Sequence, residues 1–241
     1  MVAGSVPTQG RAAHMQSLWN GRVQSWDHHS GSSAAFKAIQ AAVLDHACPG
    51  SGDAVADLGA GTGTLALALA ARVASVLAVD LAPSMLDSIG SRALAAGVSN
   101  ITPVLSDLAG LELPPASLDV IVSSYALHHL RDDEKAELVA KAYSWLRPGG
   151  RLVVADMMFG RGRSERDRQI LLEKAKAFAR KGPAGLWRLA KNIVRFSLRR
   201  GSELPVPPEF WTSALSSAGF ETVRFQAVVH EAGVVSGRRP R

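Results

Sequence analysis

The stretch VADLGAGTGTLALALA, from Val55 to Ala70, decides the fold that this sequence predicts. A short apolar run contains an acidic residue, Asp57, near its end, and three glycines then stand at every second position. These are Gly59, Gly61 and Gly63. The leucines and alanines that come next favour a helix. In an open α/β sheet the ligand lies beyond the carboxyl ends of the strands, and a glycine turn there lets the backbone approach the ligand closely.

Short apolar runs alternate with helical patterns from residue 51 onward. Strands are expected at 54–59, 75–81, 101–107, 118–125 and 150–158, and helices at 63–72, 83–96 and 132–146. Runs such as DVIVSS and RLVVAD are apolar on both faces, which is typical of buried parallel strands. The alternation predicts a parallel sheet with helices on both faces. Further helices are expected within 12–48, within 164–200 and at 209–219, and two closing strands at 221–229 and 233–237.

Positive charge is concentrated in one segment. The 241 residues carry a net charge of +6, but residues 161–200 hold 13 Lys or Arg and only 3 Asp or Glu. No aromatic platform interleaves these basic residues, so nucleic acid is not the expected partner. Three interpretations stay open for the basic helices of 164–200. They form the solvated face of a lid, a lid that attracts an anionic substrate or an acidic partner, or a peripheral helix on an anionic membrane.

The remaining composition points to a cytoplasmic protein. Cys48 is the single cysteine, so an internal disulfide is excluded. No apolar run approaches the length of a membrane span, and the first residues lack the apolar core of a secretory signal.

The glycine turn differs from the fingerprint of dinucleotide-binding proteins. That fingerprint is G-x-G-x-x-G, whereas Thr64 stands here in the place of the third glycine. A carboxylate such as Asp57 is also awkward beside a pyrophosphate. It suits a ligand that carries an ammonium and a sulfonium group.

Five stretches of the chain resemble the motifs of class I S-adenosylmethionine-dependent methyltransferases. In order along residues 51–157 they are VADLGAGTG, LAVDLAPSML, LSDLAGL, LDVIVSSYALHHL and LRPGGRLVVADM. The later stretch AGFETVRF resembles the final antiparallel hairpin of this family. Among its subgroups, the chain is most similar to the small-molecule methyltransferases related to quinone-biosynthesis enzymes.

The resemblance implies a Rossmann-like sheet of seven mostly parallel strands with helices on both faces. It also implies four segments. Residues 1–48 are expected to form an N-terminal helical cap, 49–160 the cofactor-binding α/β core, 161–206 a basic helical lid inserted after the fifth strand, and 207–241 the closing helix and hairpin of the core.

S-adenosylmethionine is the cofactor that the resemblance implies, and its polar groups are assigned to three carboxylates. Asp57 is expected to attract the methionine ammonium, and Asp80 to accept hydrogen bonds from both ribose hydroxyls, since a carboxylate has two oxygens. Asp107 is expected to accept from the adenine amino group, with the Leu108 amide nearby. Capping of the following helices is the alternative role of Asp57 and Asp80.

The other expected cofactor residues supply space and apolar walls. The glycines Gly59, Gly61 and Gly63 are expected to give the cofactor room against bare backbone, and Leu81 and Met85 to pack near the adenine. Ser124 and Tyr125 are expected beside the methionine moiety. Trp26 is expected to close the pocket from the N-terminal segment, although related enzymes have tyrosine where this chain has tryptophan.

Candidate catalytic residues are His128, His129 and Asp156. Histidine titrates near neutrality and can act as a general base, but adjacent residues point in different directions, so at most one of the pair should face the pocket. Asp156 ends the fifth strand, where it serves as a base or substrate anchor or else caps the following segment. His28 and His29 are candidates for substrate contact. No Cys/His spacing typical of a metal site is present, so no metal is expected.

The expected reaction is direct in-line displacement, in which a nucleophile of a small-molecule acceptor attacks the sulfonium methyl group. Positioning and desolvation supply much of the rate of such a step, so a general base is needed only when the nucleophile must lose a proton. Three alternatives stay open: a membrane-associated methyltransferase of a lipid or quinone-like acceptor, a catalytically silent cofactor-binding protein, and a nicotinamide-dependent oxidoreductase. The methyl acceptor and the oligomeric state are not assigned.

Overall fold

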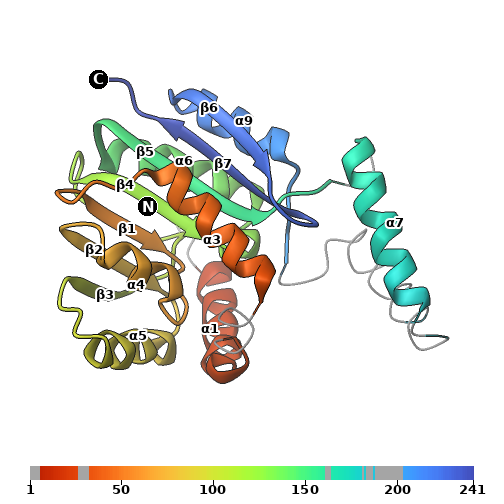
Figure 1. The fold of residues 1–241 in the computed structure, drawn as a ribbon, viewed down its shortest axis with the longest axis horizontal. Coiled ribbons are helices and arrows are strands. Elements are labelled where there is room, and N and C mark those ends of the chain that lie inside the picture. The colour runs from red at the N-terminus through yellow and green to blue at the C-terminus, as the bar shows by residue number, and fades with distance from the viewer. Residues whose placement is uncertain (1–5, 27–32, 161–163, 181, 183–186, 188–202) are drawn as a thin grey trace.

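A seven-stranded sheet forms the centre of the computed structural model, which describes residues 6–26, 33–160, 164–180, 182, 187 and 203–241 (Figure 1). Across the sheet the strands are β3 (Ile101–Leu105), β2 (Ser75–Asp80), β1 (Ala54–Leu58), β4 (Leu118–Ser124), β5 (Leu146–Met157), β7 (Ala232–Arg238) and β6 (Glu221–Ala227). The first five are parallel, β7 is antiparallel to β5, and β6 is antiparallel to β7. The predicted fold class is confirmed.

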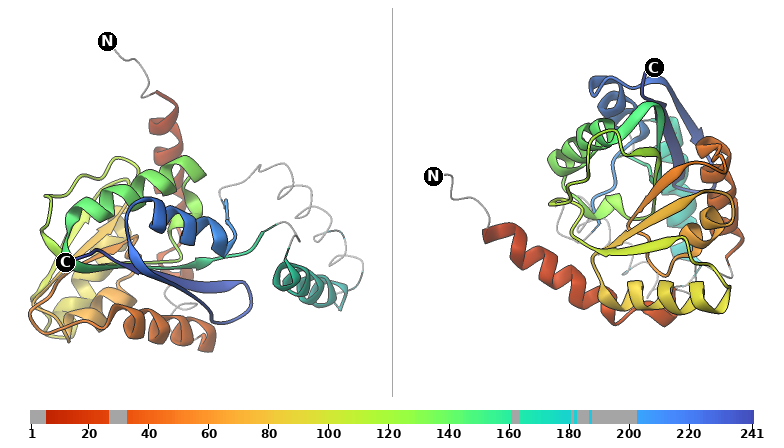
Figure 2. Two further views of the ribbon diagram at one scale, coloured as in Figure 1. Left: turned by 90° about the horizontal axis from the view of Figure 1, so that it is seen from above. Right: turned by 90° about the vertical axis from the view of Figure 1, so that its left-hand side faces the viewer.

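Helices cover both faces of this sheet, as Figure 2 shows. One face carries α3 (Ala34–Ala47), α4 (Thr64–Ala70) and α5 (Pro83–Ala95), and the other carries α6 (Asp132–Trp145) and α9 (Pro208–Ser217). Each face buries its own apolar cluster. Ile39, Leu69 and Ile89 belong to the first, and Trp145 and Trp211 to the second. The central strands are sealed on both faces, which explains their continuous apolar runs.

The expected N-terminal cap segment contains two long helices. Helix α1 (Val6–Asn20) crosses the end of the sheet, and α3 packs against β4, β5 and β7. Three side chains of α1 hold it to the core. Gln16 donates to the carbonyl of Leu81 at 3.1 Å, Asn20 receives the Ser84 hydroxyl at 2.7 Å, and Arg11 pairs with Glu134 of α6.

Helix α7 (Glu165–Ala179) begins the predicted basic insert and stands away from the sheet in Figure 1. The Ser164 side chain caps it by accepting from the amide of Asp167. The remainder of the predicted helical stretch 164–200 lies outside the described residues, apart from 180, 182 and 187. No helix in the described part of the chain is long and apolar enough to span a membrane.

Strand order reverses between β1 and β4, because β1 continues into β2 on one side and lies beside β4 on the other. Such a reversal opens a crevice at the carboxyl ends of the two strands, where open α/β sheets bind ligands. Asp57 lies near the end of β1, and Ser124 ends β4.

Candidate functional site

The glycine turn is attached to β2 by its backbone. The amides of Gly59 and Ala60 both donate to the carbonyl of Val79, at 2.8 and 2.9 Å. The amide of Gly61 donates to Oδ2 of Asp80 at 2.8 Å. The turn therefore has a defined shape before any ligand contacts it.

Packing within the protein requires two of the three glycines. A Cβ on Gly59 would lie 2.2 Å from Cβ of Ala126, and one on Gly63 would lie 2.8 Å from Cγ1 of Ile89. Both residues also have positive φ angles, of 78° and 83°. Contacts inside the protein therefore explain why glycine stands at positions 59 and 63. The prediction had given a different explanation, that these glycines leave room for a ligand. An added Cβ on Gly61 would lie 3.0 Å from Nε1 of Trp26, another cavity residue, so its predicted role of giving the cofactor room stays a prediction.

A cavity opens beside this turn at the reversal of strand order. Its wall contains many of the residues predicted to bind the cofactor, namely Trp26, Asp57, Gly59, Gly61, Met85, Ser124 and Tyr125. His129 from the catalytic set also lines it. The other predicted residues lie outside its wall, namely Gly63, Asp80, Leu81, Asp107, Leu108, His128 and Asp156. His28 and His29 lie outside the described residues.

Asp57 is the buried acid of the cavity wall. The residue is 1% exposed, and its Oδ2 has no hydrogen-bond partner among the described residues. Burial raises the pKa of Asp57 to about 7, the negative charge of Asp80 adds to the rise, and a hydrogen bond from the Ala66 amide opposes it. An unpartnered carboxylate oxygen at a cavity wall suits a cationic group on a ligand.

Asp80 lies outside the cavity wall but holds Gly61, a residue of that wall. Its Oδ2 accepts from Gly61, as described, and its Oδ1 accepts from the amide of Ala82 at 2.9 Å. Each oxygen keeps further acceptor capacity, so a ribose diol is compatible with these contacts. Burial raises the pKa of Asp80, while the amides of Ala82, Gly61 and Leu81 lower it. Asp80 therefore shapes the turn as well as being a candidate ligand contact.

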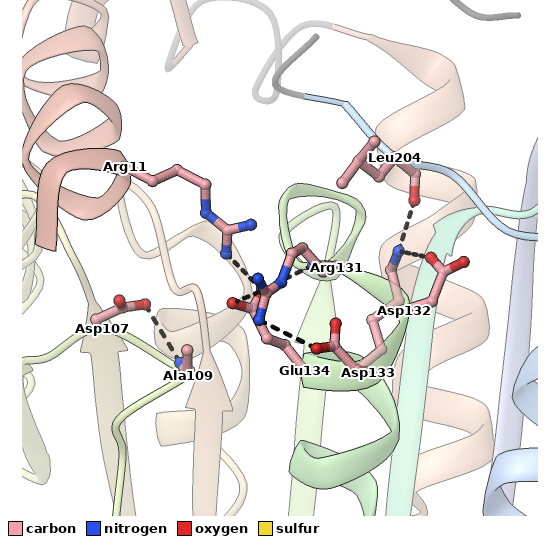
Figure 3. Close-up of polar contacts among 9 residues, drawn as sticks. Arg11, Asp107, Ala109, Arg131, Asp132, Asp133, Glu134 and Leu204 are labelled. Atoms are coloured by element: carbon pink, nitrogen blue, oxygen red, sulfur yellow. Dashed lines mark hydrogen bonds and ion pairs between the residues drawn. The ribbon is translucent and has the colours of Figure 1, made fainter. Parts of the chain in front are cut away.

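Two predicted adenine contacts have structural partners of their own. Oδ1 of Asp107 accepts from the amide of Ala109 at 3.2 Å, as Figure 3 shows. Leu108 packs against the apolar cluster under α6. Their contact with an adenine stays a prediction.

Aromatic side chains from four parts of the chain enclose the cavity. Trp19 contacts Trp26 with ring centroids 5.4 Å apart, and Trp26 contacts Phe36 at 5.4 Å. Phe36 contacts Tyr125 at 4.9 Å, and Trp19 contacts His129 at 5.5 Å. Sequence reasoning missed Trp19 and Phe36. Their only sequence signal was their position on helices that flank the predicted Trp26.

The Tyr125 hydroxyl stays protonated in this environment. Burial raises its pKa, and the negative charges of Glu231 and Asp156 raise it further. The residue also has a positive φ of 54°, an uncommon conformation for a side chain of this size. The position directly after β4 therefore holds its ring at the cavity wall at a conformational cost.

Asp156 and His128 form a buried pair behind the cavity. Oδ1 of Asp156 lies 2.6 Å from Nδ1 of His128, and Oδ2 accepts from the backbone amide of His128 at 2.8 Å. Helix α7 is capped by Ser164, and Oδ1 of Asp156 also accepts from the amide of Met157 at 2.7 Å. Of the two histidines, His129 faces the cavity and His128 is held by the acid, with their ring centroids 4.1 Å apart. The described residues contain no group of three or more metal-ligating side chains.

Comparison with known proteins links this geometry to one family. Residues 55–150, from β1 into β5, match the model of a family described as a methyltransferase domain. Over this stretch the chain is similar to a methyltransferase domain. Within it lie the glycine turn and the predicted cofactor residues from Asp57 to Tyr125. Trp19, Trp26 and Phe36 precede the methyltransferase domain, and Asp156 follows the matched residues.

Curated relatives of the domain are uncharacterized methyltransferases of bacteria. One of Bacillus velezensis is 40% identical over 129 residues, which cover 53% of this chain and 57% of that protein. One of Bacillus pumilus is 35% identical and covers 59% of this chain and 61% of that protein. A third, of a Geobacillus species, is 33% identical and covers 64% and 66%. The chain thus spans less than two thirds of the length of these relatives.

Solved structures share the architecture of the methyltransferase domain at lower identity. The DhpI–SAH complex is 17% identical with a TM-score of 0.68, and the alignment covers 96% of this chain and 98% of that one. An S-adenosylmethionine-dependent methyltransferase from Mesorhizobium loti is 22% identical with a TM-score of 0.58, covering 87% and 99%. These likenesses concern the fold and agree with the sheet order described above.

Proposed function

We propose that this protein is an S-adenosylmethionine-dependent methyltransferase that transfers a methyl group to a small-molecule acceptor. One observation carries the proposal. Asp57 belongs to the cavity wall beside the glycine turn, and its buried Oδ2 lacks a partner among the described residues. A ligand with an ammonium group, such as the methionine part of S-adenosylmethionine, would satisfy this oxygen. The match of residues 55–150 to a methyltransferase domain supports the same cofactor.

The residues of the cavity fit this cofactor along its length. Asp57 would hold the ammonium, and Asp80, which is bonded to Gly61 of the wall, would accept from the ribose hydroxyls. Met85 offers an apolar surface to the adenine, while Trp26 and Tyr125 enclose the methionine end. When bound, S-adenosylmethionine supplies a methyl group activated by its sulfonium.

Positioning is the main contribution of the protein to such a transfer. The aromatic wall of Trp19, Trp26, Phe36 and Tyr125 excludes water and restricts the approach of an acceptor. His129 is the histidine at the cavity wall, so it is the side chain placed to receive a proton from an acceptor that must lose one. The other two predicted catalytic residues contact His129 indirectly or through its ring: Asp156 bonds to His128, and the ring of His128 packs against that of His129.

The acceptor class is part of the proposal. A small molecule is favoured by a concave site with several aromatic side chains in its wall. The predicted relationship with quinone-biosynthesis enzymes stays a prediction, because the relatives named above carry no substrate in their names. Contact of 164–200 with an anionic membrane also stays a prediction. Sedimentation with anionic vesicles, at low and high salt, tests it.

Calorimetry with S-adenosylmethionine tests the cofactor, and isotope transfer tests the reaction. Wild-type protein should bind S-adenosylmethionine, and Asp57→Asn should weaken binding on the order of tenfold or more. Asp87→Asn is the matched control, because it removes the same charge from the exposed surface of α5. Methyl-labelled cofactor should then pass its label to a small molecule in an extract of the native host. Equal affinity in wild type and Asp57→Asn would contradict the cofactor site. Binding of S-adenosylmethionine without transfer of its label would contradict the proposed methyltransferase activity.

A further inference from the structure

The first turn of α6 buries two consecutive residues of opposite charge, Glu134 and Lys135. Their exposed fractions are 6% and 0%. A buried charge is costly unless it is paired and hydrogen-bonded, so each of these side chains needs partners. Glu134 accepts from the Arg131 amide at 2.8 Å and pairs with Arg11 of α1, an arrangement that Figure 3 shows. Lys135 has partners in a different part of the chain.

The ammonium of Lys135 holds the segment that leads into α9. Its Nζ donates to the carbonyl of Leu204 at 2.6 Å and lies 3.2 Å from Oδ1 of Asp132. Figure 3 shows Leu204 and Asp132 on the same side of the first turn of α6. Two residues after Leu204, Val206 is buried in the apolar cluster of this face. The ammonium and the core thus fix the path of residues 203–206.

Leu204 passes this restraint on to the histidine pair. Its amide donates to the carbonyl of His128 at 2.6 Å. His128 is therefore held at three backbone or ring atoms, since Asp156 already contacts its amide and its Nδ1. His129 follows directly, with its ring against that of His128 and against Trp19. A continuous chain of contacts leads from Lys135 through Leu204 and His128 to the cavity wall.

We propose that Lys135 is a positioning residue for His129. By fixing Leu204, it fixes the short turn 127–129 at the carbonyl of His128, so that the ring of His129 keeps its place in the cavity wall. This inference rests on the proposed methyl transfer, in which His129 faces the acceptor. Lys135 has no place in the wall of the cavity and acts through its neighbours.

Substitution of Lys135 should separate binding from transfer. Lys135→Met keeps the apolar stem but removes the ammonium that donates to the part-buried carbonyl of Leu204. We expect the affinity for S-adenosylmethionine to change by less than about twofold, because Lys135 does not line the cavity that contains Asp57 and the glycine turn. Transfer of label from methyl-labelled cofactor into host extract should fall on the order of tenfold or more, because small misplacement of a reacting group costs rate steeply.

Two further variants complete the comparison. Lys135→Gln keeps an N–H donor without the charge, so it should restore part of the lost transfer, and it also serves if Lys135→Met does not fold. Lys141→Met is the control on the same helix. The partners of Lys141 are Glu112 and Glu137 rather than Leu204, so methyl transfer should be unchanged. A loss of cofactor affinity equal to the loss of transfer in Lys135→Met would overturn the inference.

Hydrogen exchange and ring resonances supply a test that needs no methyl acceptor. In Lys135→Met the amide of Leu204 should exchange faster and the ring signals of His129 should shift, whereas Lys141→Met should leave both unchanged. An unchanged Leu204 amide together with unchanged His129 signals would overturn the inference. If wild-type protein transfers no label while these signals respond as expected, the proposed function fails and the positioning by Lys135 stands.

Discussion

A β-carbon on Gly59 would lie 2.2 Å from the β-carbon of Ala126, so the turn after β1 touches the chain after β4 at this point. The two segments come from the strands between which the order of the sheet reverses. Close approach here brings Asp57 and Tyr125 to the same cavity. The absence of a side chain at Gly59 thus allows the turn after β1 and the chain after β4 to lie in contact at the site.

Gly59→Ala should destabilise the protein and distort the cavity. The added methyl group has no room, and alanine disfavours the φ of 78°, so we expect a loss of at least about 2 kcal/mol in the free energy of unfolding. Denaturant unfolding measures it. Gly90→Ala is the control. This glycine is exposed within α5 and has nothing within 4 Å of an added Cβ, so alanine should stabilise by about 0.5–1 kcal/mol. Equal effects of the two substitutions would contradict the packing described for Gly59.

Asp57 should make the stability of the ligand-free protein fall with rising pH. Its pKa is raised from 3.8 to about 7 in the folded state, so the folded protein binds the proton more tightly than the unfolded chain. The resulting stability is fully present below the unfolded pKa and is lost as the pH rises through about 7. Thermal unfolding from about pH 4 to pH 8 should show this decrease in wild type and a flatter profile in Asp57→Asn. Parallel profiles in the two proteins would count against it.

The affinity for S-adenosylmethionine should rise with pH over the same range. The ionised form of Asp57 attracts an ammonium, and this form becomes populated as the pH passes about 7. Calorimetry at several pH values measures the dependence. In Asp57→Asn the affinity should be lower and nearly independent of pH between about 6 and 8. A pH dependence that survives in this variant would assign the titrating group elsewhere.

Asp80→Asn should weaken cofactor binding while the protein stays folded. The asparagine keeps one oxygen, so either the amide of Gly61 or that of Ala82 loses its acceptor and the turn loosens. We expect an affinity loss on the order of tenfold, measured by calorimetry, with the circular dichroism spectrum preserved. Asp53→Asn is a matched control at the other end of β1, where the carboxylate accepts from Gly50. An affinity loss as large in Asp53→Asn would show that the effect is not local to the cavity.

Arg11→Ala should loosen α1 and with it the wall that Trp19 forms. Glu134 would lose a charged partner in a nearly buried position, which costs about 1 kcal/mol once solvent screening at the half-buried Arg11 is allowed for. Hydrogen exchange should quicken in α1 and remain unchanged in the central strands. Ser17→Ala, on an exposed position of the same helix, serves as the comparison. Unchanged exchange in α1 would mean that Gln16 and Asn20 suffice to hold it.

Local patterns allowed the sheet and one side of the cavity to be predicted. Asp57, Gly61 and Ser124 lie within or just after strands, and the parallel order of the strands brings their carboxyl ends together. The order of strands and helices therefore sufficed to place them. The ends of the strands differ from the predicted ones by a few residues. Strand β5, predicted to begin at residue 150, begins at Leu146 because that residue pairs with Leu118.

Contacts between distant segments could not be predicted in the same way. Gly63 stands in a ligand-binding pattern, but its neighbour is Ile89, which only the packing of α5 brings close. Asp156 was placed at the end of a strand, whereas its partner His128 depends on the course of a short turn. Trp19 and Phe36 lie in the cavity wall because of how α1 and α3 pack in the folded chain, and local sequence patterns do not specify that packing.

Three aromatic residues of the wall and the glycine turn belong to separate stretches of the chain, so the two stretches can vary separately in evolution. Trp19, Trp26 and Phe36 precede residue 55, where the match to the methyltransferase domain starts. Drift in the first 48 residues could redirect an ancestral enzyme to a new acceptor while its cofactor turn stayed intact. The same separation suits engineering by chimeras, in which a relative's N-terminal helices that keep a tryptophan at the place of Trp26 are grafted onto this core to change selectivity.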